Sequence, residues 1–551
     1  MRIDRPFQRL LNVFILLFLV VSGTMVYWQV TQAPSLKALA YNPRHCVADT
    51  VPQRGTIYDR NGIQLAWSVK DATAPCGWRR HYADASLAPV IGYYDPQGFG
   101  ETGLEAKYED ILSGSASSPA QTISAGIDDA LRQAEHLKTF GNNIYLTIDE
   151  RIQKVASNAY NPTQQYCGTS IDSHSQRGSI LVEDPHTGEM LAMVSHPGFD
   201  NDRLVDHSTA TDGAVANDGT PLTVGEEYWN QLLNDPNKPL INRPVSDLLV
   251  PGSSFKTLTL IAALDSGAYK PRSTFNQADS LDYVVDGFDI STNNLDSYAS
   301  QPASRQFPMD IIHQFAYSNN VAFARIATTV GTQKWLEYAH QFGISYGDNL
   351  TSIDFDLDVK HSYVYRPTIP FDQVALANAG YGQATLQITP LQMSVIVSAV
   401  AADGAYYSPH LLLKSVPYGV DANSVAKNDP HLVGNTMSPQ TAQGVRQAMR
   451  AVVDYGSVGA SGGPIGVMRD SATLVGGKTG TGQVANGQNS EAWFVSLAPD
   501  DVSKDGTVNS SIQPKLAIVV QKEEGGEGAC QAPIVNTIYQ QALPLVGYPL
   551  G

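Results

Sequence analysis

Pro251-Gly252-Ser253-Ser254-Phe255-Lys256 places a serine three residues before a lysine, and the apolar run 257–264 follows it directly. Residues three apart are neighbours on one helical turn, so the hydroxyl of Ser253 and the amine of Lys256 are predicted to lie side by side. The Pro251-Gly252 turn would put the serine at a helix N-terminus, where backbone N–H groups favour developing negative charge. An amine beside a hydroxyl can act as its base, so this stretch predicts a nucleophilic serine that needs no histidine.

Two shorter strings follow in chain order and supply the other residue types of this chemistry, Ser318-Asn319-Asn320 and Lys478-Thr479-Gly480. The first precedes the helical pattern 321–327. The second follows Val475-Gly476-Gly477 and precedes Thr481, a composition typical of a strand whose backbone is approached closely. Each string is weak evidence alone, but the three in this order are a strong combination.

Chance matches to two of these patterns occur elsewhere in the chain. Ser424 and Lys427 repeat the serine–lysine spacing, and Ser291 and Asn293 repeat the serine–asparagine spacing. Both lie in polar, turn-like stretches with no apolar helix after them, which favours the set that contains Ser253. The alternative for Ser253 itself is a plain helix cap, a common role for serine at a helix start.

Length and charge limit the classes of protein that this chain can belong to. Its 551 residues predict two or more domains, and 42% hydrophobic residues supply ample material for a core. The 36 basic and 53 acidic residues give a net charge of −17, which argues against nucleic acid or an anionic membrane surface as the main partner.

The N-terminus has the pattern of a membrane anchor. Three arginines precede an uncharged, largely apolar run from Leu10 to Trp28, about the 20 residues that a bilayer requires. The alternative is a cleaved signal peptide, for which Ala38-Leu39-Ala40 offers a small-residue site. The run is longer than a signal peptide needs and that site lies well beyond it, so we expect an uncleaved anchor with the remaining chain outside the cytoplasm.

The cysteines and histidines predict no metal site. Four cysteines in an exported chain can form disulfides in three pairings. The cysteines show no spacing, to one another or to a histidine, that would hold zinc. The twelve histidines are scattered, so solvated or structural roles are expected for them.

Hydrophobic periodicity predicts strands at both ends of the chain and helices between them. This order favours an α+β domain built around an antiparallel sheet. Polar composition favours irregular insertions around the site at 198–238 and 270–307. The expected elements are hairpins at 54–66 and 179–194, a strand at 144–148 with a helix capped by Asp149, helices at 308–342 and 384–402, strands at 491–498 and 515–521, and a helix at 531–544.

These strings together resemble a class B penicillin-binding protein, a monofunctional transpeptidase of bacterial peptidoglycan synthesis. The resemblance covers nearly the whole chain. Its departures are small: Ser254 stands where threonine is common, and Gly482 where alanine or serine is usual. The compact size looks most like the actinobacterial type. Besides the anchor and the three site strings, the likeness rests on Arg54 to Gly62, Gly103-Leu104-Glu105, Thr147-Ile148-Asp149 with Gln153, Ile241-Asn242-Arg243, Thr389-Pro390-Leu391-Gln392 and Trp493-Phe494.

The resemblance implies three parts in the chain. Residues 1–33 would be a short cytoplasmic tail and a single-pass transmembrane signal anchor in the bacterial plasma membrane. Residues 34–143 would be a β-rich, non-catalytic pedestal, like the family's dimerisation domain. Residues 144–551 would be a transpeptidase domain with a central antiparallel sheet flanked by helices, as in serine β-lactamases. The pedestal is too short for a glycosyltransferase domain, so a membrane-embedded glycosyltransferase of the shape, elongation, division and sporulation family is the implied partner.

The resemblance also implies a role for each residue of the site. Ser253 would attack the carbonyl of a D-Ala-D-Ala stem peptide while neutral Lys256 takes its proton, and D-Ala would leave. Ser318 would relay a proton to the leaving amine, and Asn320 would hold Lys256 and the substrate amide. Lys478 would lower the pKa of Lys256 and supply charge for the terminal carboxylate.

Strand residues Thr479, Gly480 and Thr481 would bind the substrate in such an enzyme. The two threonine hydroxyls suit the terminal carboxylate, and the backbone N–H groups of Ser253 and Thr481 would form the oxyanion hole. An amine from a neighbouring stem peptide of a lipid II-derived strand would then release the acyl group as a cross-link. β-Lactams would acylate the same serine, and no metal or organic cofactor is expected.

Several alternatives use the same residues. A D,D-carboxypeptidase would pass the acyl group to water, and a β-lactamase would need a hydrolytic base that the sequence does not indicate. A penicillin-binding scaffold or sensor would bind partners through the pedestal. Whether the role is in elongation, in division or in sporulation is left open. For the disulfides, the fold implied by the resemblance suggests Cys167 with Cys530, which leaves Cys46 and Cys76 within the pedestal.

Overall fold

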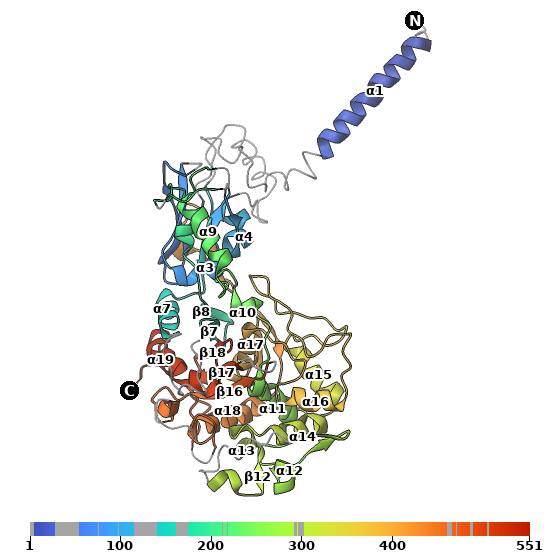
Figure 1. Cartoon of the computed structure of the whole chain (residues 1–551), viewed down its shortest axis with the longest axis vertical. Coiled ribbons are helices and arrows are strands. Elements are labelled where there is room, and N and C mark those ends of the chain that lie inside the picture. The colour runs from blue at the N-terminus through green and yellow to red at the C-terminus, as the bar shows by residue number, and fades with distance from the viewer. Residues whose placement is uncertain are drawn as a thin grey trace.

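The computed structural model has a pedestal above a larger domain that is built on one central sheet (Figure 1). No helix in the described part of the chain has both the length and the apolar character of a membrane span. The structure describes residues 5–27, 54–74, 77–96, 98–114, 140–160, 175–211, 213–216, 219–290, 295, 302–459, 465–469, 471–484, 489–503 and 506–550.

The central sheet has five antiparallel strands in the order β16-β17-β18-β7-β8. This confirms the predicted antiparallel sheet, with strands from both ends of the chain side by side. Strand β17 has the predicted bounds, because an uninterrupted apolar run marks a strand that is buried on both faces. The bounds are β7 Gly178–Asp184, β8 Glu189–His196, β16 Gly476–Gly482, β17 Glu491–Ala498 and β18 Leu516–Lys522.

Helices cover the central sheet. Helix α17 (Pro390–Ala401) packs on β7, β17 and β18, and α18 (Pro439–Asp454) packs on β16. Helices α7 (Glu150–Ala159) and α19 (Ala532–Ala542) pack against each other and on the same sheet. Cys530, just before α19, is disulfide-bonded. The other three cysteines lie outside the described residues, so the suggested pairing with Cys167 stays a prediction.

The helical part of the domain carries the predicted nucleophile. Helix α11 (Lys256–Asp265) is surrounded by α14, α15, α17 and α18. The predicted helix at 308–342 is three helices, α13 (Ile311–Ala316), α14 (Asn320–Val330) and α15 (Thr332–Gln341). The predicted helix at 384–402 begins only at Pro390, because the Thr389 hydroxyl accepts from the Gln392 N–H and caps it.

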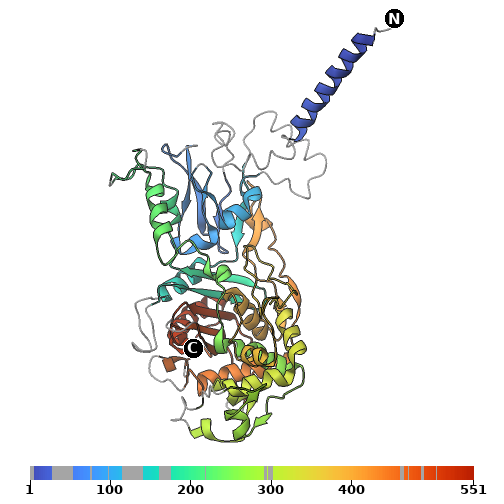
Figure 2. The ribbon, with the colours of Figure 1, turned by 45° about the vertical axis from the view of Figure 1, so that its right-hand side comes forward.

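A second five-stranded sheet, in the order β14-β6-β1-β2-β3, combines strands of the pedestal with two strands from later in the chain. Strands β1 (Ile57–Tyr58), β2 (Gln64–Lys70) and β3 (Trp78–Tyr82) come from the N-terminal part, and β6 (Asn143–Leu146) from the segment that directly precedes α7. Strand β14 (Leu412–Val416) arrives from much later in the chain and pairs with β6. Figure 2 shows this orange segment high in the molecule, near the blue strands.

Residues 198–238 differ from the expected irregular insertion around the site. They contain α8 (Asn201–Leu204) and α9 (Val224–Asn234), and they pack on the pedestal. Asp202 pairs with Arg79 and His81 of β3, and Trp229 packs its ring on Tyr93. The prediction was wrong because α9 is a partly exposed helix whose polar face hides its periodicity. The capping box at its start, Thr223 with Glu226, is the sequence signal that could have identified it.

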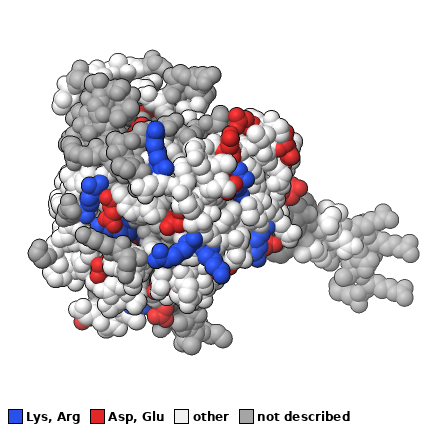
Figure 3. All heavy atoms as spheres, turned by 90° about the horizontal axis from the view of Figure 1, so that it is seen from below, with Lys and Arg blue, Asp and Glu red and all other residues white. Residues whose placement is uncertain are grey.

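Of the remaining helices and strands, α1 has 22 residues and the others are short. They are α1 Arg5–Val26, α3 Ala88–Ile91, α4 Gly103–Lys107, α5 Glu109–Leu112, α10 Arg243–Ser246, α12 Gln277–Leu281, α16 Gln373–Gly380, β4 Tyr94–Asp95, β5 Gly100–Glu101, β9 Thr274–Phe275, β10 Val284–Val285, β11 Phe288–Asp289, β12 Met309–Asp310, β13 Ala405–Tyr407 and β15 Leu432–Asn435. On the face seen from below, basic and acidic side chains are both present (Figure 3).

Candidate active site

The predicted nucleophile lies on a tight turn that leads into a buried helix. Gly252–Phe255 form one turn of 3-10 helix, η4, and α11 continues from Lys256. The Lys256 amine donates to the Ser253 hydroxyl at 2.9 Å, as the three-residue spacing predicts. The helix-cap alternative for Ser253 is not what the structure shows, since the N-cap position is Pro251 and no side chain caps the turn.

The second string supplies three acceptors to the same lysine. Lys256 Nζ lies 2.7 Å from the Ser318 carbonyl oxygen, 3.1 Å from its hydroxyl and 2.6 Å from Asn320 Oδ1. Ser318 has a left-handed backbone, φ 57°, between the end of α13 and the start of α14. That conformation turns its carbonyl and its hydroxyl toward one amine, and no pattern in the sequence predicts it.

Asn319, the middle residue of that string, fixes the turn from behind. Its side chain caps α14 by accepting from the Val321 N–H. Its amide nitrogen donates to the Ser280 carbonyl and to Gln314, each at 2.8 Å. The buried Asn319 side chain, which points away from the site, therefore holds the strained turn at Ser318 in place.

The third string lies on β16, at the edge of the central sheet. Lys478 Nζ donates to the Ser318 hydroxyl at 3.0 Å and to the carbonyl of its own neighbour, Thr479, at 3.0 Å. The Ser318 hydroxyl therefore lies between two lysine amines. The Thr479 hydroxyl is within 2.8 Å of the Ser457 hydroxyl, a contact that the sequence analysis missed because Ser457 belongs to no recognised string.

Both lysines are fully buried, and this controls their charge. Burial lowers the pKa of Lys256 well below its usual value, and the nearby Lys478 lowers it further. Burial also lowers the pKa of Lys478, to about 7. In the described part of the chain no acidic side chain forms an ion pair with either lysine, so nothing offsets the desolvation of the amines.

Glycines allow two backbone segments to touch at the site. A Cβ on Gly252 would lie 2.4 Å from the Thr481 carbonyl, and a Cβ on Gly480 would lie 2.5 Å from the Pro251 carbonyl oxygen. Gly482 would clash in the same way with Val250 O, at 2.1 Å. The departure noted in the sequence at Gly482 therefore fits this chain, because the segment before the nucleophile packs directly on β16.

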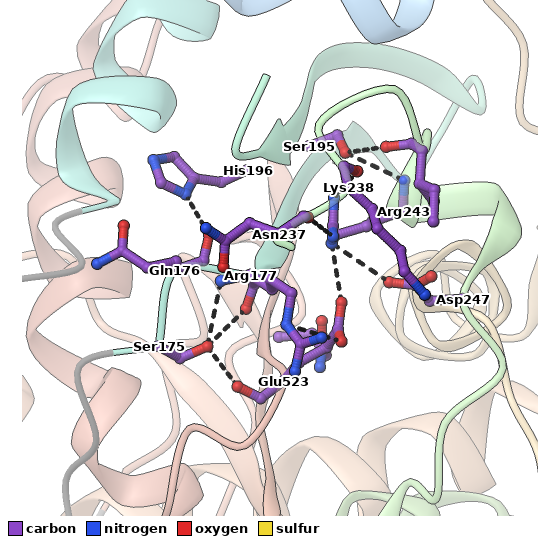
Figure 4. A network of polar contacts seen from close by, with 12 residues as sticks. Ser175, Gln176, Arg177, Ser195, His196, Asn237, Lys238, Arg243, Asp247 and Glu523 are labelled. Carbon is purple, nitrogen blue, oxygen red and sulfur yellow. Dashed lines mark hydrogen bonds and ion pairs between the residues drawn. The ribbon is translucent and has the colours of Figure 1, made fainter. Parts of the chain in front are cut away.

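A buried arginine fastens the segment that leads to the nucleophile (Figure 4). Arg243 Nε pairs with Glu523 at 2.8 Å, just beyond the end of β18, and its guanidinium also donates to the carbonyls of Asn237 and Lys238. Its backbone N–H donates to Ser195 on β8 at 3.1 Å. The arginine of the Ile241-Asn242-Arg243 string therefore holds the approach to Ser253 on the central sheet.

The structure brings the predicted site residues together at one place. Ser253, Lys256, Ser318, Asn320 and Lys478 form a continuous hydrogen-bonded chain, and Thr479, Gly480 and Thr481 continue along β16 beside it. Ser424 of the chance match is instead on an exposed turn, where its hydroxyl donates to Asp421 O. Ser291 and Asn293 lie outside the described residues. No group of metal-binding side chains occurs among the residues that the structure describes.

Comparison with known proteins points to one family. Residues 178–540 match the model of the penicillin binding protein transpeptidase domain, and residues 54–132 match that of the penicillin binding protein A dimerisation domain. The chain is 28% identical to the peptidoglycan D,D-transpeptidase PbpA of Mycolicibacterium smegmatis, over 96% of this chain and 97% of that protein. It is 24% identical to the peptidoglycan D,D-transpeptidase MrdA of Escherichia coli, over 84% and 66%.

Solved structures share the fold. The imipenem acyl-enzyme complex of penicillin-binding protein A from M. tuberculosis superposes with a TM-score of 0.69 at 24% identity, over 90% of this chain and 99% of that one. Penicillin-binding protein 2 of Pseudomonas aeruginosa superposes with a TM-score of 0.65 at 23% identity, over 90% and 96%. Because the transpeptidase model matches about two thirds of the sequence, the chain belongs to the penicillin-binding protein transpeptidase family.

Proposed function

We propose that this chain is a serine D,D-transpeptidase that cross-links peptidoglycan stem peptides and is acylated by β-lactams. The observation that carries the proposal is the chain of contacts from the Ser253 hydroxyl through Lys256 to Ser318 and Lys478. It joins a hydroxyl nucleophile to a buried amine whose pKa is lowered, with no histidine involved. The relatives named peptidoglycan D,D-transpeptidase match over most of their length, which supports the same activity here.

Acylation begins with the removal of the Ser253 proton. Lys256 Nζ, 2.9 Å away and neutral because it is buried next to a second amine, accepts that proton as Ser253 Oγ attacks the carbonyl between the two D-alanines. The Asn320 amide oxygen and the Ser318 carbonyl accept hydrogen bonds from the Lys256 amine. They hold its nitrogen in place, so the lone pair lies near the hydroxyl that it serves.

Expulsion of D-alanine needs a proton on the leaving amine. The Ser318 hydroxyl lies 3.1 Å from Lys256 and 3.0 Å from Lys478, so it can pass a proton from Lys256 to the leaving nitrogen. When the Lys478 amine is charged, it stabilises the terminal carboxylate of the donor peptide, with the hydroxyls of Thr479 and Thr481. The hydrogen bond between the Ser318 hydroxyl and the Lys478 amine therefore links the group that donates the proton to the group that binds the carboxylate.

The tetrahedral intermediate carries negative charge on the former carbonyl oxygen. We assign its stabilisation to the backbone N–H groups of Ser253 and Thr481, an arrangement typically worth about 3 kcal/mol per donor. The acyl-enzyme on Ser253 is then attacked by the amine of a second stem peptide, which forms the cross-link and frees the serine. No step requires a metal or an organic cofactor.

The location and partners follow from the same proposal. We propose a single-pass anchor within 1–33, a pedestal at 34–143 and a transpeptidase domain at 144–551. Helix α1 does not by itself have the length and apolar character of a span, and what supports the anchor is that its side chains from Val13 to Val21 are apolar and exposed. The catalytic domain would then lie outside the plasma membrane, with lipid II-derived strands as substrate. The pedestal would receive a membrane-embedded glycosyltransferase, since the chain's two family matches include no polymerising domain.

A fluorescent penicillin tests the proposal directly. The full-length chain in detergent is incubated with the probe beside Ser253→Ala and beside Ser424→Ala, which removes the serine of the chance match. Covalent label on wild type and on Ser424→Ala, and none on Ser253→Ala, is the expected result. No label on a folded wild-type chain would overturn the proposal in favour of a scaffold.

The fate of the acyl group separates the related activities. With stem-peptide strands and an active glycosyltransferase, we expect cross-linked dimers together with free D-alanine. D-alanine without dimers would indicate a D,D-carboxypeptidase. Rapid loss of penicillin label with turnover would indicate a β-lactamase.

A further inference from the structure

Three backbone segments that are far apart in the sequence meet beside the nucleophile. Gly252 lies against the Thr481 carbonyl, as described above, and Gly382 lies against the backbone of Gly252. A Cβ on Gly382 would lie 1.7 Å from the Gly252 carbonyl oxygen. Gly252 and Gly382 have φ values of 55° and 88°, where a side chain is disfavoured. The segment after α16 is therefore part of the wall of the site.

The next residue in that segment reaches β16. Gln383 Nε2 donates to the Thr481 carbonyl oxygen at 3.2 Å, across 98 positions of sequence. In an antiparallel strand the N–H and C=O of one residue point to the same side. Gln383 belongs to no strand of the sheet and β16 is at its edge, so the Thr481 carbonyl that accepts from Gln383 is expected to face away from β17, and the Thr481 N–H with it. The same N–H is the one that the proposed oxyanion hole uses.

Hydrogen bonds hold the backbone before and after Gln383 in place. Its own N–H donates to the Asn378 carbonyl at the end of α16, at 3.1 Å. Five residues later, Ile388 exchanges backbone hydrogen bonds with Leu249, in the segment that leads to the nucleophile. The Gly380 carbonyl accepts from Thr259 on α11 at 2.8 Å. The side chain of Gln383 therefore starts from a backbone that is tied to the nucleophile helix.

From this geometry we infer that Gln383 is a positioning residue of the oxyanion hole, acting through the Thr481 peptide group. It is not a catalytic residue, because its amide donates to a backbone carbonyl of the protein. The inference rests on the proposed acyl-transfer function of the site. Since β16 is an edge strand of the sheet as far as the structure describes it, no strand in that part of the chain flanks Thr481 on its outer side to set the direction of its N–H. The Gln383 amide takes the place of that neighbour.

The expected consequence lies in the chemical step rather than in binding. A small rotation of the Thr481 peptide would lengthen the hydrogen bond to the developing oxyanion without emptying the site. Acylation at saturating penicillin should therefore slow about tenfold when the Gln383 donor is removed, while the dissociation constant of the first complex changes little.

The test compares variants of the full-length chain in detergent, by stopped-flow acylation with a chromogenic cephalosporin. Gln383→Ala removes the donor, and Gln383→Asn keeps the amide but shortens its reach by one methylene. Gln383→Glu replaces the donor by a carboxyl group that can donate only when it is protonated. Gln387→Ala, in the same segment and also partly buried, is the matched control.

We expect both Gln383→Ala and Gln383→Asn to lower the saturating acylation rate about tenfold, with Tm and the Gln387→Ala rate close to those of wild type. The ratio of Gln383→Glu to wild type should rise as pH falls, while the ratio for Gln383→Ala stays flat. Equal saturating rates for Gln383→Ala and wild type, or a flat Gln383→Glu ratio, would overturn the inference. Failure of wild type itself to acylate would instead overturn the proposed function.

Discussion

The pedestal and the active site each bury two cationic side chains, and they treat the charge in opposite ways. In the pedestal, Arg54 and Arg80 donate to the two carboxylate oxygens of buried Glu105, each at 2.6 Å. In the site, Lys256 and Lys478 are surrounded by hydroxyl, amide and carbonyl oxygens, with no carboxylate ion pair in the described part of the chain. The cationic side chains of both clusters are buried, so what differs between the clusters is the kind of group that each cation contacts.

The groups that contact each buried side chain decide whether that side chain stays ionised. Burial alone would raise the pKa of Glu105, but Arg80 and Arg54 lower it below its usual value. Burial alone would lower the pKa of Arg54, but Glu105 and Glu109 raise it overall. The lysines have no such compensation, so their pKa values fall. Buried cations that are paired hold a structure together, and buried amines without a carboxylate become bases near neutral pH.

The largest expected effect comes from removing the amine of Lys256, which has hydrogen bonds but no carboxylate partner in the described part of the chain. Lys256→Met replaces it by an apolar side chain of similar length, and the penicillin acylation rate should fall about 10³-fold because the general base is lost. Stability should be unchanged or higher, since a desolvated amine is replaced. Acylation kinetics and Tm check this, with exposed Lys270→Met as the control. Acylation within tenfold of wild type would show that Lys256 is not the base.

The matching change in the pedestal should have the opposite profile. Arg54→Met leaves Glu105 with one fewer cation, so the free energy of unfolding should drop by about 3 kcal/mol. The acylation rate per folded molecule should stay the same, as the pedestal carries no site residue. Denaturant unfolding measures the first quantity and stopped-flow acylation the second. Arg79→Met, which removes partly exposed ion pairs with Asp71 and Asp202, should cost less than about 1 kcal/mol.

The pH dependence of acylation sharpens the comparison at the site itself. Acylation should rise with pH while Lys256 loses its proton, because only the neutral amine is a base. It should fall again as pH passes about 7, where Lys478 loses the charge that binds the carboxylate. A penicillin methyl ester has no carboxylate and should lack the alkaline decline. Identical alkaline limbs for acid and ester, measured from pH 5 to 10, would refute this role of Lys478.

The smallest effect is expected at a third kind of buried group, a carboxyl without enough cations. Burial raises the pKa of Glu491 to about 8, and the nearby Glu523 and Glu524 add to the shift. In the unfolded chain this carboxyl ionises near its usual pKa of 4.5, so the folded state, which keeps the proton, loses stability as pH rises from there to about 8 and loses no more above it.

Glu491→Gln removes that penalty. Between pH 5 and pH 9 its stability should rise relative to wild type by about 1 to 2 kcal/mol. Thermal unfolding across this range provides the measurement, with partly exposed Glu337→Gln on α15 as the control. A constant difference between Glu491→Gln and wild type would mean that Glu491 is already ionised at pH 5.

Local patterns in the sequence were read correctly where the contact is also local. The Ser253–Lys256 contact follows from three-residue spacing on one turn, and β17 follows from one apolar run. The meeting of Ser253, Ser318 and Lys478 is non-local. It was expected only through the family resemblance, since no periodicity relates residues 160 positions apart.

Several strings that carried the resemblance have structural explanations that the sequence did not reveal. Arg54 and Glu105 lie in two separate strings and pair with each other. Gln153 exchanges hydrogen bonds with the backbone of Met193 on β8. Gln383 was missed altogether, because a glutamine after a Gly in a loop looks like any surface residue until the backbone it reaches is known.

The composition of the pedestal sheet has a consequence for anyone who recombines such genes. Strand β14 is encoded between α17 and α18, and α9 is encoded between β8 and the nucleophile, yet both complete the pedestal. A chimaera that exchanges only the first 143 codons would give β14 and α9 foreign neighbours. To transplant the pedestal intact, three segments would have to move together: the first 143 codons, α9 and β14. Two of the three lie within the catalytic part of the gene.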